Sequence, residues 1–177
     1  MIPKDSSTGG EGNPNPFPNS FTDEFLYTLD HRGRINFPAP FRRALSERSR
    51  DRVVVTRGLD GCLFVFPKDV WENHRREFNR TPYTPQQQRR LQRLLAHGAK
   101  ESTFDAQGRI TLSPRLIEMA RLEKEVLIIG SGDRVELWNP DVYERYISES
   151  DQTVESILEE FLTRSLANPD RASEDDT

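Results

Sequence analysis

The alternation of apolar and polar positions between residues 21 and 148 predicts short strands interspersed with short helices. Clusters rich in β-branched and aromatic residues recur along this body, each bounded by glycine, proline or aspartate. The expected strands are 25–30, 34–37, 53–56, 62–66, 99–104, 109–112, 125–129 and 134–138. The expected helices are 38–45, 68–78, 86–96, 114–120 and 140–148. The pattern indicates a mainly β chain with short helices, an α+β fold.

The two halves of this body are copies of one unit. Thr28–Phe37 aligns with Thr103–Leu112 at an offset of 75 residues, and the Thr, Asp, Gly, Arg and Ile of the two segments are identical. Farther along, Val53–Val55 aligns with Val126–Ile128 at an offset of 73. Such self-similarity indicates a repeated structural unit, and a lone hairpin is too small to bury its apolar face. We therefore expect two tandem repeats that share one small closed or interlocked β-barrel.

Residues Asp30-His31-Arg32-Gly33 have the composition of a type I turn. Aspartate at the first position accepts hydrogen bonds from the following backbone N–H groups, and glycine at the fourth tolerates a positive φ. A type I turn followed by a left-handed glycine makes a hairpin loop with a bulge. The loop then projects Arg32 at its tip, and Arg34 begins the return strand.

The second copy makes the same turn with Asp105 and Gly108, and it presents Gln107 and Arg109. A turn needs the aspartate and the glycine, but it does not need an arginine at its exit. Two explanations for the exit arginines stay open. They pair with the aspartate of the turn, or they offer the guanidinium to a phosphate or to a guanine edge.

Charge is distributed unevenly along the chain. The sequence has 25 Lys+Arg and 29 Asp+Glu, a formal net charge of −4. Residues 149–177 carry nine acids and two arginines, and residues 1–20 carry two acids and one lysine, so the body at 21–148 has a net charge of +4. Eight arginines lie within 31–57 alone. A basic stretch of this kind is suited to phosphate contact, although a charge run is more often a solvated face.

Both ends of the chain differ from the body. Residues 1–20 hold four prolines, three glycines and seven Ser, Thr or Asn, a composition that predicts a disordered arm. Residues 153–166 repeat apolar side chains at helical spacing. They predict an amphipathic helix whose apolar stripe docks on the body or on a neighbouring subunit. Residues 168–177 are expected to be a frayed acidic tail.

Several classes of protein are excluded by composition and by missing motifs. The longest apolar runs have four residues, whereas a membrane-spanning helix needs roughly 18. The N-terminus lacks a signal-like apolar segment, and a single cysteine excludes an intramolecular disulfide. No zinc, phosphate-loop or serine-hydrolase motif is present, and Cys62 at a strand start is typical of a small buried thiol. We expect a cytoplasmic protein that is not an enzyme and has no cofactor, metal or small-molecule substrate.

Five separated motifs resemble the MraZ family of bacterial transcriptional regulators, which is built from tandem SpoVT-AbrB-like units. The motifs are Tyr-Thr-Leu-Asp-His-Arg-Gly-Arg at 27–34, Thr-Arg-Gly-Leu-Asp-Gly-Cys-Leu at 56–63, Gln-Arg-Leu-Leu at 92–95, Asp-Ala-Gln-Gly-Arg-Ile at 105–110 and Gly-Asp-Arg-Val-Glu-Leu-Trp-Asn at 132–139. The resemblance covers about residues 21–148. It implies a barrel of the double-split or swapped-hairpin type, followed by a C-terminal helix. Composition and the resemblance together predict an arm at 1–20, units at 24–71 and 99–142, a helical linker at 72–98, C-terminal helices at 143–167 and an acidic tail at 168–177. The arm is longer than the family usually shows.

The resemblance also implies a function and the residues that perform it. Members of the family form rings of identical subunits, bind direct repeats in the promoter of the division and cell-wall gene cluster, and usually repress it. Double-stranded DNA and further copies of the chain are therefore the expected partners, in the cytoplasm at the nucleoid, with no membrane contact. The expected DNA-binding residues are Arg32, Arg34, Gln107 and Arg109, in turns formed by Asp30, Gly33, Asp105 and Gly108. Arg42 and Arg43 are candidate phosphate contacts.

A ring-forming scaffold without specific DNA affinity is the main alternative. The apolar residues of 153–166 fit such a scaffold, whereas the repeated arginine turns favour DNA. Identical subunits arranged head to tail present identical loops, so the expected DNA site consists of direct repeats spaced near one helical turn, roughly 10 bp.

Overall fold

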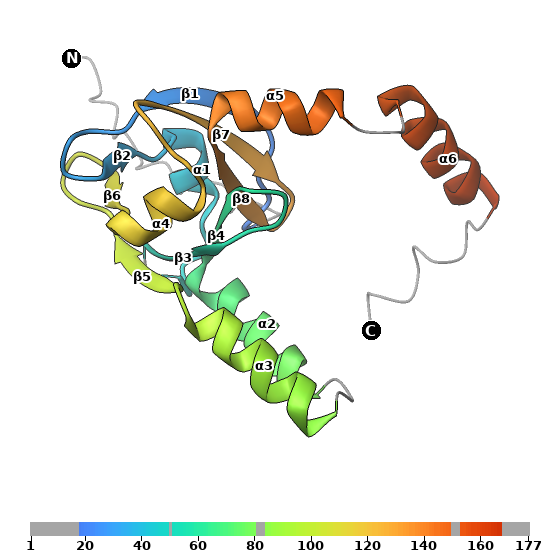
Figure 1. Ribbon diagram of the computed structural model, residues 1–177, viewed down its shortest axis with the longest axis horizontal. Helices are drawn as coiled ribbons and strands as arrows, with labels where there is room; N and C mark the ends of the chain where they lie inside the picture. Colours follow the sequence, from blue (N-terminus) through green and yellow to red (C-terminus); the bar gives the residue numbers. More distant parts are fainter. Residues whose placement is uncertain (1–17, 50, 81–83, 150–152, 168–177) are drawn as a thin grey trace, which may run out of the picture. The chain divides into compact units, whose positions relative to one another are not determined.

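The strands of the two repeats interleave in one antiparallel sheet (Figure 1). The computed structural model describes residues 18–49, 51–80, 84–149 and 153–167. Most of the predicted N-terminal arm and the whole predicted acidic tail lie outside these residues. The chain divides into two units, 1–140 and 141–177, and each is described by itself.

The six-stranded sheet has the order β1-β7-β8-β4-β3-β5. The first repeat supplies β1 (Glu24–Thr28), β3 (Arg52–Arg57) and β4 (Leu63–Pro67), and the second supplies β5 (Lys100–Thr103), β7 (Glu125–Ser131) and β8 (Arg134–Trp138). The remaining strands, β2 (Arg34–Asn36) and β6 (Arg109–Thr111), form a separate two-stranded sheet. The strands β1, β3 and β4 of the first repeat correspond to β5, β7 and β8 of the second. If each strand is replaced by its counterpart and the sheet is read from its other edge, the strand order is the same. The fold therefore has the internal symmetry that the sequence repeat predicts.

Each repeat gives its first strand to the other repeat. Strand β1 pairs with β7, with Leu26 opposite Leu127, and β5 pairs with β3, with Lys100 opposite Val55. Neither repeat can complete its part of the sheet alone. This exchange confirms the predicted α+β fold of two swapped repeats that share one core.

The exchange also corrects one local expectation. The turn at residues 30–34 was expected to close a hairpin between the first two strands of the repeat. The Asp30 N–H donates to the Arg34 carbonyl at 2.9 Å, but β1 and β2 then diverge into different sheets. The turn therefore links two sheets, because the partner of each strand comes from the other repeat.

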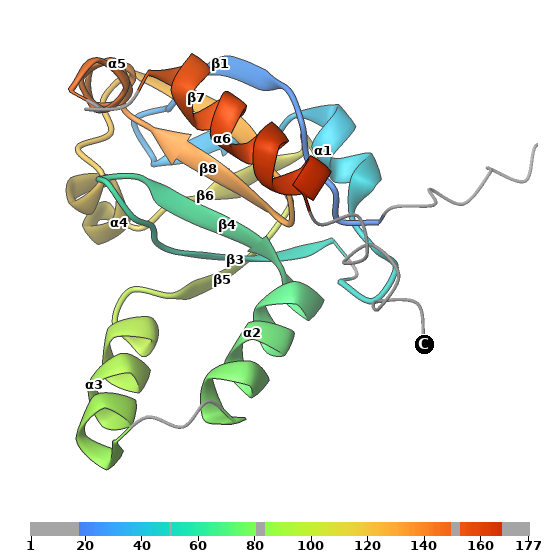
Figure 2. The ribbon, with the colours of Figure 1, turned by 90° about the vertical axis from the view of Figure 1, so that its right-hand side faces the viewer.

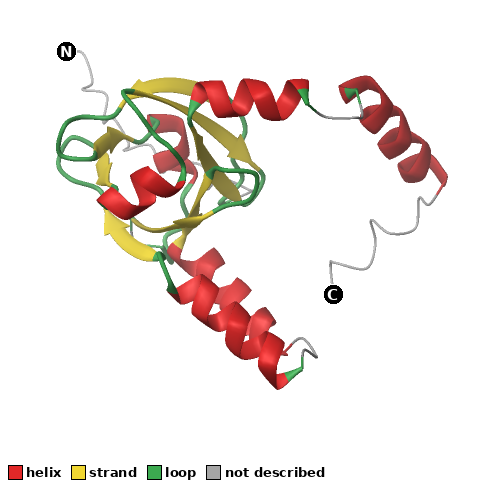
Figure 3. Cartoon of the chain, viewed as in Figure 1, coloured by secondary structure: helices red, strands yellow, loops and turns green. Residues whose placement is uncertain are grey.

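Helices follow the strands at equivalent places in the two repeats (Figure 3). Short helices α1 (Ala39–Ala44) and α4 (Pro114–Met119) follow β2 and β6, and each has proline in its first turn, where the missing N–H is tolerated. Helix α2 (Lys68–Arg80) runs two residues beyond the predicted end. Helix α3 (Pro85–Ala96) begins with a capping box between Thr84 and Gln87. The second unit holds most of α5 (Pro140–Ser148) and all of α6 (Val154–Ala167).

The main core lies between the six-stranded sheet, the β2–β6 pair and the two short helices. Phe41 of α1 is at its centre, with the rings of Phe21, Phe25 and Phe37 at centroid distances of 5.5, 5.3 and 6.0 Å. Burying each large apolar side chain contributes roughly 1.5–3 kcal/mol. A second cluster on the outer face of the sheet packs Trp71 of α2 against Val54 and Phe66. Helices α2 and α3 extend side by side from this end of the sheet (Figure 2).

The ordered fold reaches back into the segment that was expected to be an arm. The Asn19 side chain donates to both carboxylate oxygens of Asp69 at 3.2 Å and accepts from the Ser46 N–H at 2.9 Å. Asp69 also accepts from the hydroxyls of Ser46 and Ser49 at 2.6 Å each. Partial burial raises the pKa of Asp69, but these hydrogen bonds outweigh it and hold the pKa below its ordinary value. Asn19, within the segment predicted to be an arm, therefore ties the chain to the start of α2.

Candidate nucleic-acid interface

Asp30 organises the first turn with both of its carboxylate oxygens. Oδ1 accepts from the backbone N–H groups of Arg32 and Arg34 at 2.9 Å each. Oδ2 accepts from Arg34 Nε at 2.7 Å and lies 2.7 Å from Nη2. These hydrogen bonds, first of all the one from the Arg34 side chain, hold the pKa of Asp30 well below its usual range. The aspartate shapes the turn and fixes the orientation of the exit arginine at the same time.

The second turn reproduces this arrangement. Asp105 Oδ1 accepts from the N–H groups of Gln107 at 2.9 Å and Arg109 at 3.0 Å, and Oδ2 accepts from Arg109 Nε at 2.8 Å and lies 2.7 Å from Nη2. The hydrogen bond from the Arg109 side chain is the main cause that lowers the pKa of Asp105 to about 2. In both turns the exit arginine is therefore paired with the turn aspartate, the first of the two explanations left open by the sequence.

This pairing leaves part of each guanidinium available to a ligand. An arginine side chain has five N–H donors. When the aspartate takes Nε–H and one proton of Nη2, the outer edge keeps the two protons of Nη1 and one of Nη2. That outer edge is the end-on fork that pairs with a guanine edge or a phosphate. Ion pairing within the turn and recognition of a ligand are therefore compatible for Arg34 and Arg109.

The glycine in each turn adopts the left-handed conformation, with φ of +71° at Gly33 and +75° at Gly108. Gly33 also lies close to the chain of the other repeat, since a Cβ there would come within 2.7 Å of the Leu112 carbonyl oxygen. The Leu112 N–H donates to the Gly33 carbonyl at 2.7 Å, and the Phe37 N–H donates to the Gly108 carbonyl at 3.0 Å. Each turn is thus hydrogen-bonded to the strand end of the opposite repeat.

The two exit arginines lie on one face of the β2–β6 ribbon. Arg34 is opposite Thr111, and Arg109 is opposite Asn36. The central pair, Ile35 and Ile110, is fully buried. Because successive strand residues point to opposite faces, the four flanking side chains face outward. The arginines are diagonal neighbours, about 7–8 Å apart at Cα.

A third arginine lies against the second turn. A Cβ on Gly108 would come within 2.9 Å of three guanidinium atoms of Arg42 in α1. In the first turn the equivalent neighbour of Gly33 is Ile117 of α4, the residue 75 positions after Arg42 in the sequence. Arg42 Nε is buried and has no hydrogen-bond partner among the described residues. The second turn therefore has a cation at a place where the first turn has an apolar side chain.

The remaining predicted residues lie at the tips or beside them. Arg32 and Gln107 are exposed at equivalent positions in the two turns, which lie at opposite ends of the antiparallel ribbon. Arg43 is exposed on α1, and no contact among the described residues brings it to either turn. Asn36 and Thr111 share the outward face of the ribbon with the arginines, and neither is among the site residues predicted from the sequence. The period-two alternation around Ile35 and Ile110 is the signal that identifies them.

Other chemistry has little support in the part of the chain that the structure describes. Cys62 is buried, and burial is the main cause that raises its pKa to about 12, so the thiol stays protonated at neutral pH. Across residues 18–49, 51–80, 84–149 and 153–167, no group of three or more His, Cys, Asp or Glu is placed to hold a metal ion. The helices within those ranges are all too short or too polar to cross a bilayer.

Comparison with known proteins agrees with the resemblance in the motifs. The family described as "MraZ protein, putative antitoxin-like" matches the chain twice, at residues 20–94 and 95–165. Proteins named transcriptional regulator MraZ from Natranaerobius thermophilus and Carboxydothermus hydrogenoformans are 38% and 39% identical over 142 residues, which is 80% of this chain and 96% of each relative. The protein of that name from Halothermothrix orenii is 39% identical over 137 residues, 77% of this chain and 93% of the relative. The chain therefore belongs to the MraZ family.

Proposed function

We propose that this protein is a sequence-specific DNA-binding transcriptional regulator, and that it acts as a repressor. The observation that carries the proposal is the β2–β6 ribbon, which has Arg34 and Arg109 on its outward face, each held by a turn aspartate. The major groove admits a two-stranded β-ribbon, and ribbons are an established means of reading base edges. The name of the relatives, transcriptional regulator, supports the same conclusion.

The aspartates prepare the arginines for base recognition. Asp30 fixes the inner edge of the Arg34 guanidinium and directs the outer fork away from the turn. A side chain already held in its bound geometry loses less entropy when it binds. The two forks start about 7–8 Å apart, which corresponds to roughly two base-pair steps at 3.4 Å each. We therefore assign base readout to Arg34 and Arg109, and to Asn36 and Thr111 on the same face.

Phosphate contact is assigned to the cations around the tips. Arg32 is exposed at the first tip and adds a positive charge there, because Asp30 is already paired with Arg34. The second tip has Gln107 at that position, and Arg42 beside Gly108 supplies the missing cation. Arg43, exposed on the same helix, is a further candidate. Phosphate contacts fix the register on the duplex without specifying its sequence.

One ribbon is too small to bind tightly by itself. A good bidentate arginine–base pair contributes about 1–3 kcal/mol of discrimination. Several subunits bound to one duplex gain avidity, because each additional contact is intramolecular. We propose a ring homo-oligomer at the nucleoid that binds direct repeats about one helical turn apart, in the promoter of the division and cell-wall gene cluster. Identical loops of head-to-tail subunits favour direct repeats over a palindrome.

A footprint on the DNA upstream of the gene for this protein tests the proposal. The expected result is protection of short direct repeats, spaced near 10 bp, with an affinity that falls steeply as salt increases. Duplexes with scrambled repeats serve as the control for non-specific binding. A protein that assembles normally but ignores both duplexes at low salt would instead be the scaffold that is the main alternative.

A further inference from the structure

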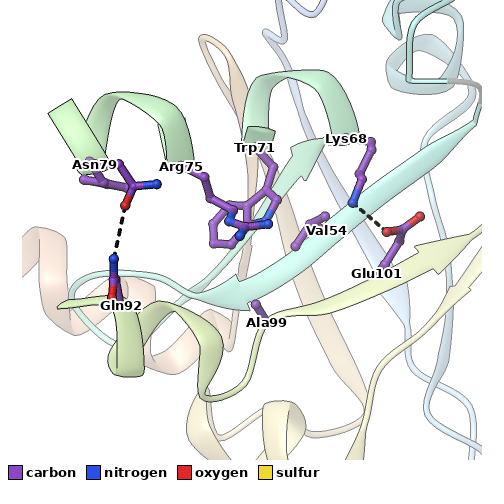
Figure 4. A pocket seen from close by; sticks show the side chains of 9 residues that line it. Val54, Lys68, Trp71, Arg75, Asn79, Gln92, Ala99 and Glu101 are labelled. Atoms are coloured by element: carbon purple, nitrogen blue, oxygen red, sulfur yellow. Dashed lines mark hydrogen bonds and ion pairs between the residues drawn. The ribbon is translucent and has the colours of Figure 1, made fainter. Parts of the chain in front are cut away.

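A groove on the outer side of the sheet has no function in the proposed DNA interface. It lies where α2 and α3 leave the sheet, next to β3 and β5, and has a volume of about 500 Å3 (Figure 4). Trp71, Phe78, Val54 and Ala99 give it an apolar lining. Arg75 lines it as well and is exposed. The groove therefore combines an apolar floor with a cationic rim.

Hydrogen bonds hold the groove open at both ends. The Gln92 side chain of α3 donates to Asn79 of α2 at 3.2 Å, and Lys68 Nζ lies 2.7 Å from a carboxylate oxygen of Glu101 (Figure 4). The buried cluster of Trp71 with the sheet supports the floor from below. The groove is thus formed in the isolated chain, and an occupant does not have to create it.

The two helices that flank the groove are basic, and the charged side chains that line it are Lys68, Arg75 and Glu101. Helix α2 has four Lys or Arg and three Asp or Glu, and α3 has three arginines and no acid, so the two helices together have a net charge of +4. The occupant that fits this surface is an amphipathic helix with an apolar stripe and acidic flanks.

Helix α6 has these properties. Its large apolar side chains Ile157, Leu158, Phe161 and Leu162 repeat at a spacing of four residues and form one stripe. Within the single chain they stay 49%, 53%, 63% and 49% exposed. An exposed apolar patch of this kind marks an interaction site.

The polar side of α6 carries the opposite charge from the groove. Three glutamates and one arginine give the helix a net charge of −2. Glu155 and Glu160 border the stripe on its two sides, as the 3.6-residue period places them. Arg164 pairs with Glu160 at 2.6 Å, which leaves Glu155 and Glu159 to face a basic partner. At 1.5 Å per residue the 14-residue helix is about 21 Å long, similar to the 13-residue α2 beside the groove.

We propose that α6 of one copy docks in the α2–α3 groove of the next copy. The side chains of the stripe are exposed and the groove has a free apolar lining, and each copy carries one of each. Two different surfaces that complement one another join copies head to tail, and such a chain closes into a ring when the rotation allows. The inference rests on the oligomer in the proposed function and assigns its interface. It also places the acidic helix away from the arginines that face DNA.

Two full-length variants test the contact separately. Phe161→Asp places a charge in the stripe, and Thr163→Asp places the same charge on the opposite face of α6 as a control. Arg75→Glu reverses the charge at the groove rim without altering the buried Trp71 or the hydrogen bond between Gln92 and Asn79. Native mass spectrometry and light scattering should show that the stripe and groove variants fall to monomers at concentrations where the Thr163→Asp control keeps the mass of the unmodified protein.

Mixing the two variants provides the decisive result. The stripe variant keeps its groove and the groove variant keeps its stripe, so the mixture should form one-to-one pairs and nothing larger. Failure of the mixture to pair, an unmodified protein that is already monomeric, or variants that keep the full mass would each overturn the proposal. Phe161→Asp that lowers the melting temperature without changing the mass would show docking within one chain. A groove variant that keeps its mass but loses DNA affinity would assign the groove to DNA.

The same samples separate this inference from the proposed function. Arg34→Ala should weaken DNA binding and leave the mass of the oligomer unchanged. Phe161→Asp should change the mass, keep weak salt-dependent DNA binding by single subunits, and lose the avidity. If the interface lies elsewhere, the mixture will not form pairs, but Arg34→Ala will still weaken DNA binding and keep the mass of the oligomer.

Discussion

The guanidinium of Arg42 lies against the α-carbon of Gly108, in the turn of the other repeat. Its counterpart Ile117 occupies the same place against Gly33. The two repeats share their backbone arrangement but differ in the chemistry that supports each tip. The internal symmetry of the fold therefore does not extend to its electrostatics, and the two tips are not equivalent towards DNA.

Replacing Arg42 with the residue of the other repeat tests this difference. Arg42→Ile should keep the protein folded, because Ile117 shows that isoleucine fits against a turn glycine. Stability should be unchanged or slightly higher, since the variant removes a buried Nε without a partner. DNA affinity should fall alike for specific and random duplexes, and the salt slope should drop by about one unit. An unchanged slope would show that Arg42 does not contact phosphate.

The ion pair in the second turn predicts a pH dependence with a definite sign. Arg109 lowers the pKa of Asp105 from an ordinary value of 3.8 to about 2. The folded state therefore binds a proton less readily than the unfolded state. The stabilisation is complete above the unfolded pKa and is lost as the pH falls from about 4 towards 2. Carboxyl NMR shifts should show Asp105 titrating near the lower value, and Arg109→Ala should return its pKa towards 3.8. A normal titration in the unmodified protein would contradict the pairing.

Two glycines with similar backbone angles should differ in their tolerance of a side chain. Gly33 and Gly132 have φ of +71° and +66°, but a Cβ on Gly33 meets the Leu112 carbonyl whereas one on Gly132 has no neighbour within 4 Å. Gly132→Ala should cost about 1–2 kcal/mol for the left-handed backbone alone. Gly33→Ala should cost about 1–3 kcal/mol more for the close contact. Denaturant unfolding of both variants measures the difference in unfolding free energy. Equal losses of stability would show that Gly33 does not lie against Leu112, the residue that follows β6.

Asn19 should matter more to stability than the whole segment before it. Deleting residues 1–17 should leave the melting temperature nearly unchanged, because their composition supplies almost nothing to a core. Asn19→Ala should cost about 1–3 kcal/mol, because it leaves the Ser46 N–H and part of Asp69 without a partner. Thermal unfolding of both proteins distinguishes the two cases. A large effect of the deletion together with none for Asn19→Ala would reverse this account of the N-terminus.

Local sequence patterns predicted the parts of the fold that depend on neighbouring residues. The Asp30 and Asp105 motifs indicated the turns, and the repeated clusters indicated strands within a few residues of their bounds. The turn chemistry also raised the possibility that Arg34 pairs with Asp30. Each of these features is determined within a few positions of the chain, so one sequence suffices to find it.

Long-range placement could not be obtained in the same way. The pairing of β1 with β7 depends on a partner about 100 residues away, and nothing local distinguishes it from a hairpin with β2. The sequence indicated Arg42 only as a candidate phosphate contact beside Arg43, because its position against Gly108 follows from the exchange of strands between repeats. The alternation of strand residues predicts that Asn36 faces outward. Its place in the candidate site, however, depends on its pairing opposite Arg109.

The proposed function requires that the arginine pair on the ribbon reads DNA. Arg34→Ala and Arg109→Ala remove the forks but keep the aspartates and glycines of the turns. Arg34→Lys is the matched variant, since it keeps the charge and loses the planar fork. Asp30→Asn combined with Arg34→Ala controls for the carboxylate that the single variant leaves unpaired.

The most direct measurement is the dissociation constant of each of these proteins for the protected repeats and for random DNA, across a range of salt concentrations. Loss of one fork should weaken specific binding by about five- to 150-fold per subunit, equivalent to about 1–3 kcal/mol. Binding to random DNA should change far less, and the mass should stay unchanged. The melting temperature should fall only slightly, because the ion pair that is lost is partly exposed to solvent. Arg34→Lys should behave like Arg34→Ala at the specific site. Unaltered specific affinity in the double variant Arg34→Ala/Arg109→Ala, together with lowered stability, would show that the arginines only brace their turns and would contradict the account.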